Sequence, residues 1–182
     1  MAAVLQLPNE LSQVDQIRMS CNAADRFVQR YYEALSSPSS SVEKLTSFYA
    51  PLDDNTNIAK SFFGFKNIWY NGNEFSSPAE FATAVKDYLT PARYEIDSYD
   101  CQPLNPDLNP TRDVVSDPSK GGAMSLLLSV SGECRIGPMK ESEPMDFSET
   151  IILVPNLNHD RSGPTSHSSN EWVISSQIFR NV

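Results

Sequence analysis

The residue in this chain best suited to chemistry is Glu149. It lies in the segment Asp146–Pro155, where apolar and polar residues alternate as in a strand, and it falls on the side that carries large apolar residues. Gln177 falls on the corresponding side of the similar segment at residues 171–182. A carboxyl group held among apolar side chains has a raised pKa, and beside a tyrosine such as Tyr31 or Tyr94 it resembles a proton-shuttling pair. The interpretation that we favour is structural, with Glu149 at the rim of the core and satisfied by solvent or backbone.

Other residue types that could bind a metal or a cofactor are poorly placed for it. The only histidines, His159 and His167, lie in a polar Ser- and Asn-rich segment without a cysteine or carboxylate at ligand spacing. The segment Ser119-Lys120-Gly121-Gly122 lacks the glycine spacing of a phosphate-binding loop. We therefore predict no metal, no cofactor and no buried catalytic histidine.

Length, charge and cysteine content narrow the class of protein. A chain of 182 residues is large enough for one domain with a core that needs no disulfide. The formal net charge of -9 argues against a protein that binds nucleic acid alone. Three distant cysteines (Cys21, Cys101 and Cys134) fit reduced thiols in the nucleus or cytosol. We find no stretch long enough to span a membrane, and the start MAAVLQLP does not read as a signal peptide.

The elements that must position these residues begin with helices. An apolar stripe at steps of three and four predicts an amphipathic helix over residues 10–36. Ser40 and Glu43 form a capping box that opens a short second helix. The run Ser77-Pro78-Ala79-Glu80 predicts the start of a third helix, which ends near Leu89.

Strands dominate the remainder of the chain. Alternating patterns predict strands over 93–101, 124–135, 146–155 and 171–182, and a shorter one over 67–75 that turns at Asn71-Gly72. Polar segments at about 103–120 and 156–170 read as loop insertions. The order of elements predicts a single α+β domain over residues 1–182, with one sheet and helices on one of its faces.

The sides of the strands that face away from the predicted core are nearly uncharged. They carry Ser, Thr, Leu, Ile, Val and Trp172, whereas a sheet face that meets water normally alternates toward charged residues. Such a patch is typical of a protein–protein interface, although a covering loop or a serine-rich exposed sheet is the alternative. The predicted partner-binding residues are Leu127, Ser129, Thr150, Ile152, Ile174, Ser176, Ile178 and Arg180.

Arg180 is the one charged residue well along the last strand on this face. A charge buried in an interface is costly unless a carboxylate meets it. In a symmetric homodimer, a residue near the twofold axis meets its own copy. An Arg near that axis therefore favours a different partner that carries an acidic residue.

Several motifs together resemble the nuclear transport factor 2-like family over almost the whole chain. They are Leu45-x-x-Phe48-Tyr49, Trp172-x-x-x-Ser176-x-x-Phe179-Arg180, Asn71-Gly72 and the helix start at Ser77–Glu80. The resemblance implies a cone-shaped fold, in which a strongly bent antiparallel sheet carries three helices on its concave face. Members of the family commonly dimerise through the outer face of the sheet.

Within that family the chain most resembles the small subunit of the fungal heterodimeric mRNA export receptor. This resemblance implies a non-enzymatic adaptor that shuttles between nucleus and cytoplasm and binds a larger subunit through a similar domain. It further implies that Arg180 pairs with a carboxylate of that subunit. Phenylalanine-glycine nucleoporins are implied as partners, RNA is bound mainly through the complex, and no membrane is involved.

Two alternatives remain within the same fold. One is an isomerase or dehydratase that would use Glu149. The other is the homodimeric carrier of the GTPase Ran, which usually has an Asp where this chain has Gln177.

Overall fold

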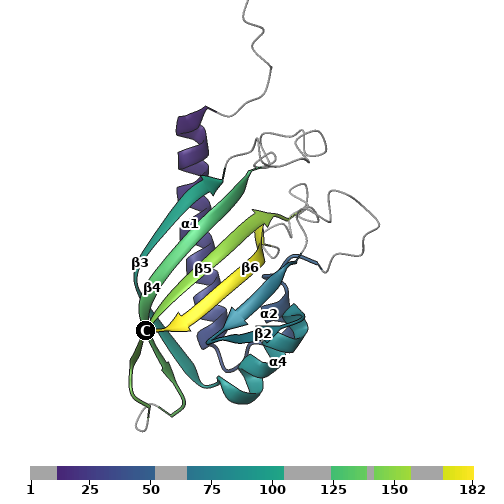
Figure 1. Ribbon diagram of the computed structural model, residues 1–182, viewed down its shortest axis with the longest axis vertical. Coiled ribbons are helices and arrows are strands. Elements are labelled where there is room, and N and C mark those ends of the chain that lie inside the picture. Colours follow the sequence, from purple (N-terminus) through teal and green to yellow (C-terminus); the bar gives the residue numbers. More distant parts are fainter. Residues whose placement is uncertain (1–11, 52–64, 105–123, 139–141, 157–169) are drawn as a thin grey trace, which may run out of the picture.

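The computed structural model describes residues 12–51, 65–104, 124–138, 142–156 and 170–182. Their helices and strands form one α+β unit (Figure 1). In chain order the elements are α1 (Gln13–Ser36), α2 (Val42–Thr46), β1 (Asn67–Tyr70), β2 (Asn73–Phe75), α4 (Pro78–Tyr88), β3 (Ala92–Leu104), β4 (Ser125–Ile136), β5 (Met145–Pro155) and β6 (Trp172–Asn181). The strands form a single six-stranded sheet in the order β2-β1-β6-β5-β4-β3.

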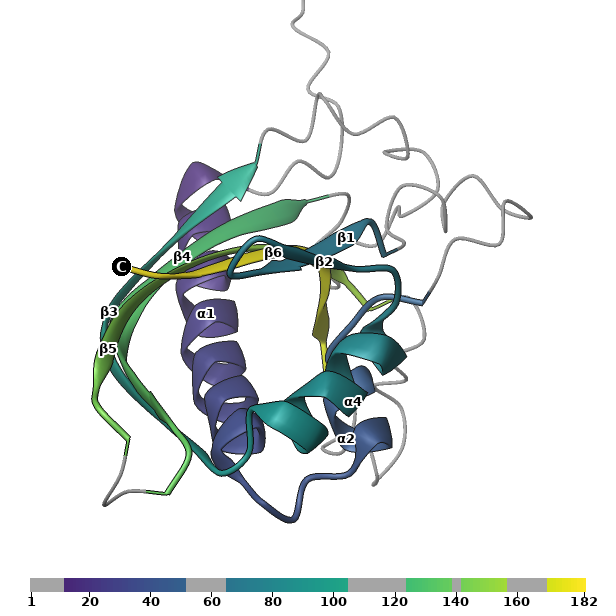
Figure 2. The same ribbon diagram turned by 60° about the horizontal axis from the view of Figure 1, so that its bottom comes forward.

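The sheet is strongly bent, and α1, α2 and α4 lie on its concave side (Figure 2). The predicted α+β fold with helices on one face of a curved sheet is confirmed. The prediction of a purely antiparallel sheet is wrong, because β1 pairs with β6 in parallel. All other strand pairs in the sheet are antiparallel.

Helix α1 begins where Ser12 accepts a hydrogen bond from the backbone N–H of Asp15, at 3.1 Å. The predicted apolar stripe is buried only in its later part. Val14 is 64% exposed and Ile17 is 50% exposed, because the first turns of α1 extend past the sheet (Figure 1). Only the part of the stripe that the sheet covers belongs to the core.

The two shorter helices are capped by serine. In α4, Ser77 accepts a hydrogen bond from the backbone N–H of Glu80 and Pro78 is the first helical residue, as predicted. For α2 the predicted cap was one residue too early, since Ser41, not Ser40, accepts the N–H of Lys44 at 3.1 Å. Adjacent serines present the same side-chain chemistry, so the sequence pattern did not separate them.

Long, regularly paired strands form the centre of the sheet. Residue Leu126 pairs with Leu153 and Leu128 with Ile151, and all four side chains are buried against the helices. Strand β3 continues to Leu104, so the predicted loop insertion begins later than residue 103. The remainder of that insertion, residues 105–120, and residues 157–169 of the second one lie outside the described residues.

Strands β3 and β4 approach unusually closely at Gly132. A Cβ atom at this position would lie 2.1 Å from the carbonyl oxygen of Glu95. The contact lies beside an irregularity in the pairing between Ile96 and Ser98, where the sheet bends. Glycine is required here because any side chain would force the two strands apart.

Aromatic rings fill the space between the sheet and the helices. The ring of Phe179 stacks on that of Tyr70 at a centroid distance of 4.4 Å and on that of Phe147 at 5.1 Å. From α1, Tyr31 packs edge-on against Phe48, at 5.4 Å. The core is therefore closed by large side chains contributed by strands and helices alike.

Candidate partner-binding site

The outer face, meaning the side of the sheet opposite α1, α2 and α4, is formed by three rows of neighbouring side chains. Figure 1 looks onto this side of the sheet. The central row consists of Glu74, Trp69, Ile178, Thr150, Ser129 and Asp100. The row toward the start of β6 consists of Asn67, Ser176, Ile152, Leu127 and Gln102. The row toward the end of β6 consists of Arg180, Ser148, Ser131 and Ser98. Neighbours within such rows have Cβ atoms about 4.5–5.5 Å apart.

Seven of the eight predicted partner-binding residues lie in these rows. The side chain of Ile178 is 40% exposed, although it is a large apolar group near the middle of the face. Ser129, Thr150 and Arg180 are also exposed, whereas Leu127, Ile152 and Ser176 are half-buried.

The eighth residue, Ile174, was assigned to the wrong side. Its side chain is fully buried in the core opposite Leu153, with 0% of its surface exposed. The pairing of β5 with β6 shifts between Ile152 and Leu153, so Ser175 is an extra residue in β6. Such a bulge reverses the alternation, and for the same reason Trp172 faces the core.

A neighbouring segment, residues 48–50, pairs with the edge of β6 beyond this bulge. The N–H of Ala50 donates to the carbonyl oxygen of Ile174 at 2.8 Å, and the N–H of Ile174 donates to Phe48 at 2.7 Å. Ala50 then packs with Val154 and Val173 in a small second apolar cluster. Val154 and Val173 are buried, so beyond the bulge β5 and β6 present no exposed side chain on the outer face.

Sequence reasoning missed Trp69 and Asn67 as members of this face. Trp69 lies beside Ile178, and the hydroxyl of Ser176 donates to the side-chain oxygen of Asn67. The sequence does contain a signal for Trp69: Ile68 and Tyr70 on either side of it face the core, so by alternation Trp69 points outward. The parallel pairing that brings it beside β6 joins segments about a hundred residues apart, and no local pattern encodes it.

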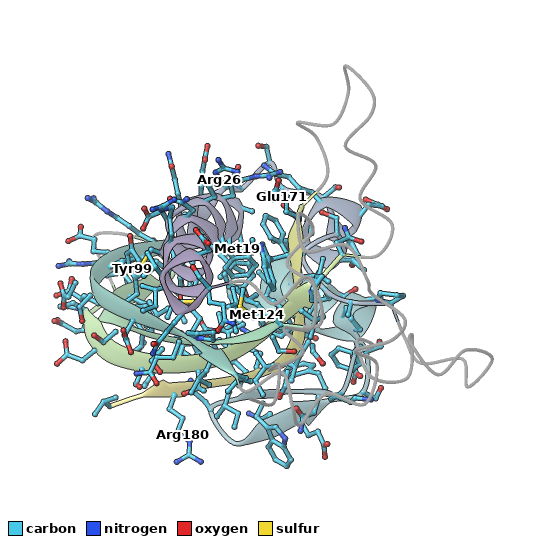
Figure 3. All side chains as sticks on the ribbon, turned by 90° about the horizontal axis from the view of Figure 1, so that it is seen from above. Met19, Arg26, Tyr99, Met124, Glu171 and Arg180 are labelled. Atoms are coloured by element: carbon cyan, nitrogen blue, oxygen red, sulfur yellow. The ribbon has the colours of Figure 1, made fainter. Side chains whose placement is uncertain are left out.

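Arg180 projects from the outer side of the sheet, away from α1 (Figure 3). Among the described residues no carboxylate lies within ion-pair distance of its guanidinium. The two other arginines near this face differ, since Arg93 pairs with Glu95 at 2.8 Å and Arg135 pairs with Glu133 at 3.2 Å. Arg180 is thus a fixed cation whose counter-charge is not supplied by the described part of the chain.

The inner side of the same strands holds a buried polar cluster around Glu149. The hydroxyl of Tyr32 and the amide of Gln177 donate to its two carboxylate oxygens. Gln177 also donates to Tyr31 at 2.8 Å and accepts from Tyr49 at 2.6 Å. All five side chains are buried, so the prediction that Glu149 lies at the rim of the core is wrong.

Burial is the main cause of the raised pKa values in this cluster. It raises the pKa of Glu149 to about 7, while the hydrogen bonds from Tyr32 and Gln177 act in the opposite direction. Burial also raises the pKa of Tyr31, Tyr32 and Tyr49, which keeps their phenols protonated. Glu149 has a pKa suited to proton transfer, yet only 1% of its surface is exposed and both oxygens are engaged by side chains of the core.

The described residues contain neither a metal-binding cluster nor a membrane-spanning helix. Among these residues no group of three or more His, Cys, Asp or Glu side chains is arranged to hold a metal ion. Both histidines, His159 and His167, fall outside them. The described helices include none with the length and apolar character needed to cross a bilayer.

The fold of the chain matches that of solved NTF2-like domains. No family model and no curated protein matches the chain in sequence. Solved structures do match, and they define the class: the chain has the nuclear transport factor 2-like fold.

The particular protein that it resembles is Mtr2. A chain of the Chaetomium thermophilum Mex67 NTF2-like domain complexed with Mtr2 is 26% identical, with a TM-score of 0.65 over 90% of this chain and 98% of that one. A chain of the Sac3N peptide bound to Mex67:Mtr2 is also 26% identical, with a TM-score of 0.66 over 90% and 99%. Mtr2 itself is 24% identical, with a TM-score of 0.62 over 90% and 99%.

An enzyme-like protein has the same fold at much lower identity. The putative scytalone dehydratase from Novosphingobium aromaticivorans is 8% identical, with a TM-score of 0.59 over 93% of this chain and 89% of that one. At this identity the match concerns the fold alone.

Proposed function

We propose that this chain is a non-enzymatic nuclear export adaptor, the small subunit of a heterodimeric mRNA export receptor. The observation that carries the proposal is the outer face, where apolar and hydroxyl side chains surround Arg180, which has no ion-pair partner among the described residues. The similarity to chains of Mex67–Mtr2 complexes supports a partner with a related domain.

The proposed mechanism is scaffolding. The sheet of the larger subunit packs on the three rows and buries Ile178, Ile152 and Leu127, while a carboxylate of that subunit pairs with Arg180. Full burial of each large apolar side chain contributes on the order of 1.5–3 kcal/mol. The two domains together then form the surface that binds phenylalanine-glycine nucleoporins and RNA, and the complex shuttles between nucleus and cytoplasm.

The geometry around Glu149 favours the adaptor over an enzyme of the same fold. A catalytic acid or base must reach a proton on a bound substrate. Here the oxygens of Glu149 are engaged by Tyr32 and Gln177 within the core. Gln177 also faces inward, so the position that usually carries Asp in the Ran carrier presents no side chain to a surface partner.

The test is a binding measurement with Arg180→Glu. The purified chain is titrated calorimetrically with the corresponding domain of the larger subunit from the same organism. We expect a 1:1 complex with the wild type, weakened by on the order of 2–5 kcal/mol in Arg180→Glu, because the variant places two like charges together in the interface. Arg18→Glu makes the same charge change on α1, where the side chain is 70% exposed, and should bind like the wild type.

Two results would contradict the proposal. One is the absence of any binding by the wild type. The other is a stable homodimer that Arg180→Glu leaves intact, which would return attention to the homodimeric carrier. Turnover of a ketone substrate that Glu149→Gln abolishes would support the enzyme instead.

A further inference from the structure

The central row of the outer face ends in a carboxylate at each edge of the sheet. Glu74 lies on edge strand β2, opposite Trp69, and Asp100 lies on edge strand β3, opposite Ser129. Both side chains are exposed. Between them the row holds only Trp69, Ile178, Thr150 and Ser129. The central row thus has an uncharged middle and an acidic residue at each end.

Neither edge carboxylate is neutralised by a cation of the described residues. Asp100 accepts a hydrogen bond from the neutral amide of Gln102 at 2.8 Å, and Glu74 has no ion-pair partner in the described ranges. By contrast, Glu95 and Glu133 lie toward the far end of the same face and each pairs with an arginine of its own strand. Glu74 and Asp100 keep their full charge.

This charge pattern disfavours a second copy of the chain as the partner. In a face-to-face dimer with aligned sheets, a twofold axis along the strands brings β2 over β3, so Glu74 meets Asp100. A twofold axis across the strands brings each edge over its own copy, so Glu74 meets Glu74. Both arrangements place carboxylate against carboxylate, and Arg180, on the third strand from the β2 edge, reaches neither.

We propose that the partner is a different chain whose binding sheet carries Lys or Arg residues at both edges, facing Glu74 and Asp100, in addition to a carboxylate facing Arg180. This inference rests on the proposed function and specifies the chemistry of the partner. The partner has the inverse pattern, with basic edges and an acidic group near the middle. Like charges at the two edges select this partner over a second copy.

The edge charges have a defined physical effect. Exposed charges at the rim of an interface chiefly change the association rate and its salt dependence, whereas central groups change the dissociation rate. Because the Debye length is about 10 Å at 0.1 M salt, the attraction is screened as salt increases. The net charge of -9 has the same sign as the edges and adds to the attraction for a basic partner.

The test compares two double variants with the same change in net charge. Glu74→Lys/Asp100→Lys reverses both edges. Glu33→Lys/Asp87→Lys, on the exposed sides of α1 and α4, makes an equal change away from the outer face. Association and dissociation rates with the larger subunit's domain are measured by surface plasmon resonance at about 0.02 M and 0.5 M salt. Lysine is tolerated at sheet edges, so both variants should fold.

We expect the edge variant to associate on the order of tenfold more slowly than the control variant at low salt, with most of the difference lost at high salt. If the wild type binds but the two variants behave alike, the inference is wrong and the proposed function stands. A wild-type homodimer in sedimentation that Arg180→Glu dissociates would also overturn the inference. If the wild type does not bind the larger subunit at all, the proposed function fails and the inference fails with it.

Discussion

At the scale of single residues, Glu149 is an acidic residue in a fully buried position. It occupies a strand position that alternation assigns to the core, and the structure places it there with hydrogen bonds from Tyr32 and Gln177. A buried carboxyl group is stable when its hydrogen bonds are satisfied and its charge is removed. The raised pKa of about 7 means that the protonated form is favoured in the folded state below neutral pH.

This pKa predicts a specific pH dependence of folding. An unfolded Glu has a pKa of 4.5, so between pH 4.5 and pH 7 the folded state keeps a proton that the unfolded state has lost. The stability gained from this proton is fully present below pH 4.5 and is lost as pH rises through 7. The shift corresponds to about 3 kcal/mol. Urea unfolding at pH 5, 6, 7 and 8 should show the free energy of unfolding of the wild type falling relative to Glu149→Gln by about this amount.

The control for this measurement is Glu33→Gln, which removes an exposed carboxyl group from α1. Its stability should follow that of the wild type in parallel across the same pH range. A parallel curve for Glu149→Gln as well would mean that Glu149 is ionised in the folded protein.

At the scale of elements, the bulge in β6 decides which side chains a partner can reach. Before the extra residue Ser175, Ile174 faces the core, and after it Ile178 faces outward, although both have the same parity in the sequence. The bulge also lies where residues 48–50 hydrogen-bond to Ile174, and Val154 and Val173 beyond it are buried. One inserted residue thus separates a region that stabilises the fold from a region that is free to bind.

Two alanine variants distinguish these regions. Ile174→Ala leaves a cavity in the core and should lower the free energy of unfolding by about 2–5 kcal/mol. Ile178→Ala should lower the free energy of unfolding by less than about 1 kcal/mol, because the side chain is partly exposed. The same variant should weaken binding to the larger subunit by about 1–2 kcal/mol. Chemical unfolding and calorimetry measure the two quantities. A larger loss of stability in Ile178→Ala than in Ile174→Ala would contradict the assignment of faces.

At the scale of the whole molecule, the concave side and the outer side of one sheet have separate tasks. The concave side is filled by aromatic rings and by the polar cluster around Glu149, so it holds the fold together. The outer side keeps Trp69 and Ile178 at the surface beside Arg180, Glu74 and Asp100, which have no ion-pair partner in the described part of the chain. A molecule of this kind gains stability when a partner covers its outer side.

Partner binding should therefore raise the melting temperature, and the rise should follow the logarithm of the free partner concentration once it exceeds the dissociation constant. A partner that binds only the folded state adds about 2.7 kcal/mol when its free concentration is 100 times the dissociation constant. Differential scanning fluorimetry of the chain with increasing amounts of the larger subunit's domain should show a rising melting temperature. The same titration with Arg180→Glu should need a much higher partner concentration, and equal curves for both forms would contradict a role for Arg180 in binding.

The sequence by itself determined the periodic features of this protein. Spacing of apolar residues predicted α1 and the long strands, and the capping residues Ser77–Glu80 predicted the start of α4. Alternation assigned Glu149 and Gln177 to the core and seven of the eight chosen residues to the outer face. These features depend on neighbours within a few residues, which a sequence pattern records directly.

Only the tertiary structure decided the features that depend on contacts between distant segments. The bulge in β6 lies where residues 48–50 and strand β5 both pair with that strand, and it reverses the alternation on which Ile174 was assigned. The parallel pairing of β1 with β6 brings Trp69 beside Ile178, and sheet order alone makes Glu74 and Asp100 the two edges of one row. Register and strand order are set by packing across the whole sheet, and for that reason the shape of the binding face could not be read from local sequence.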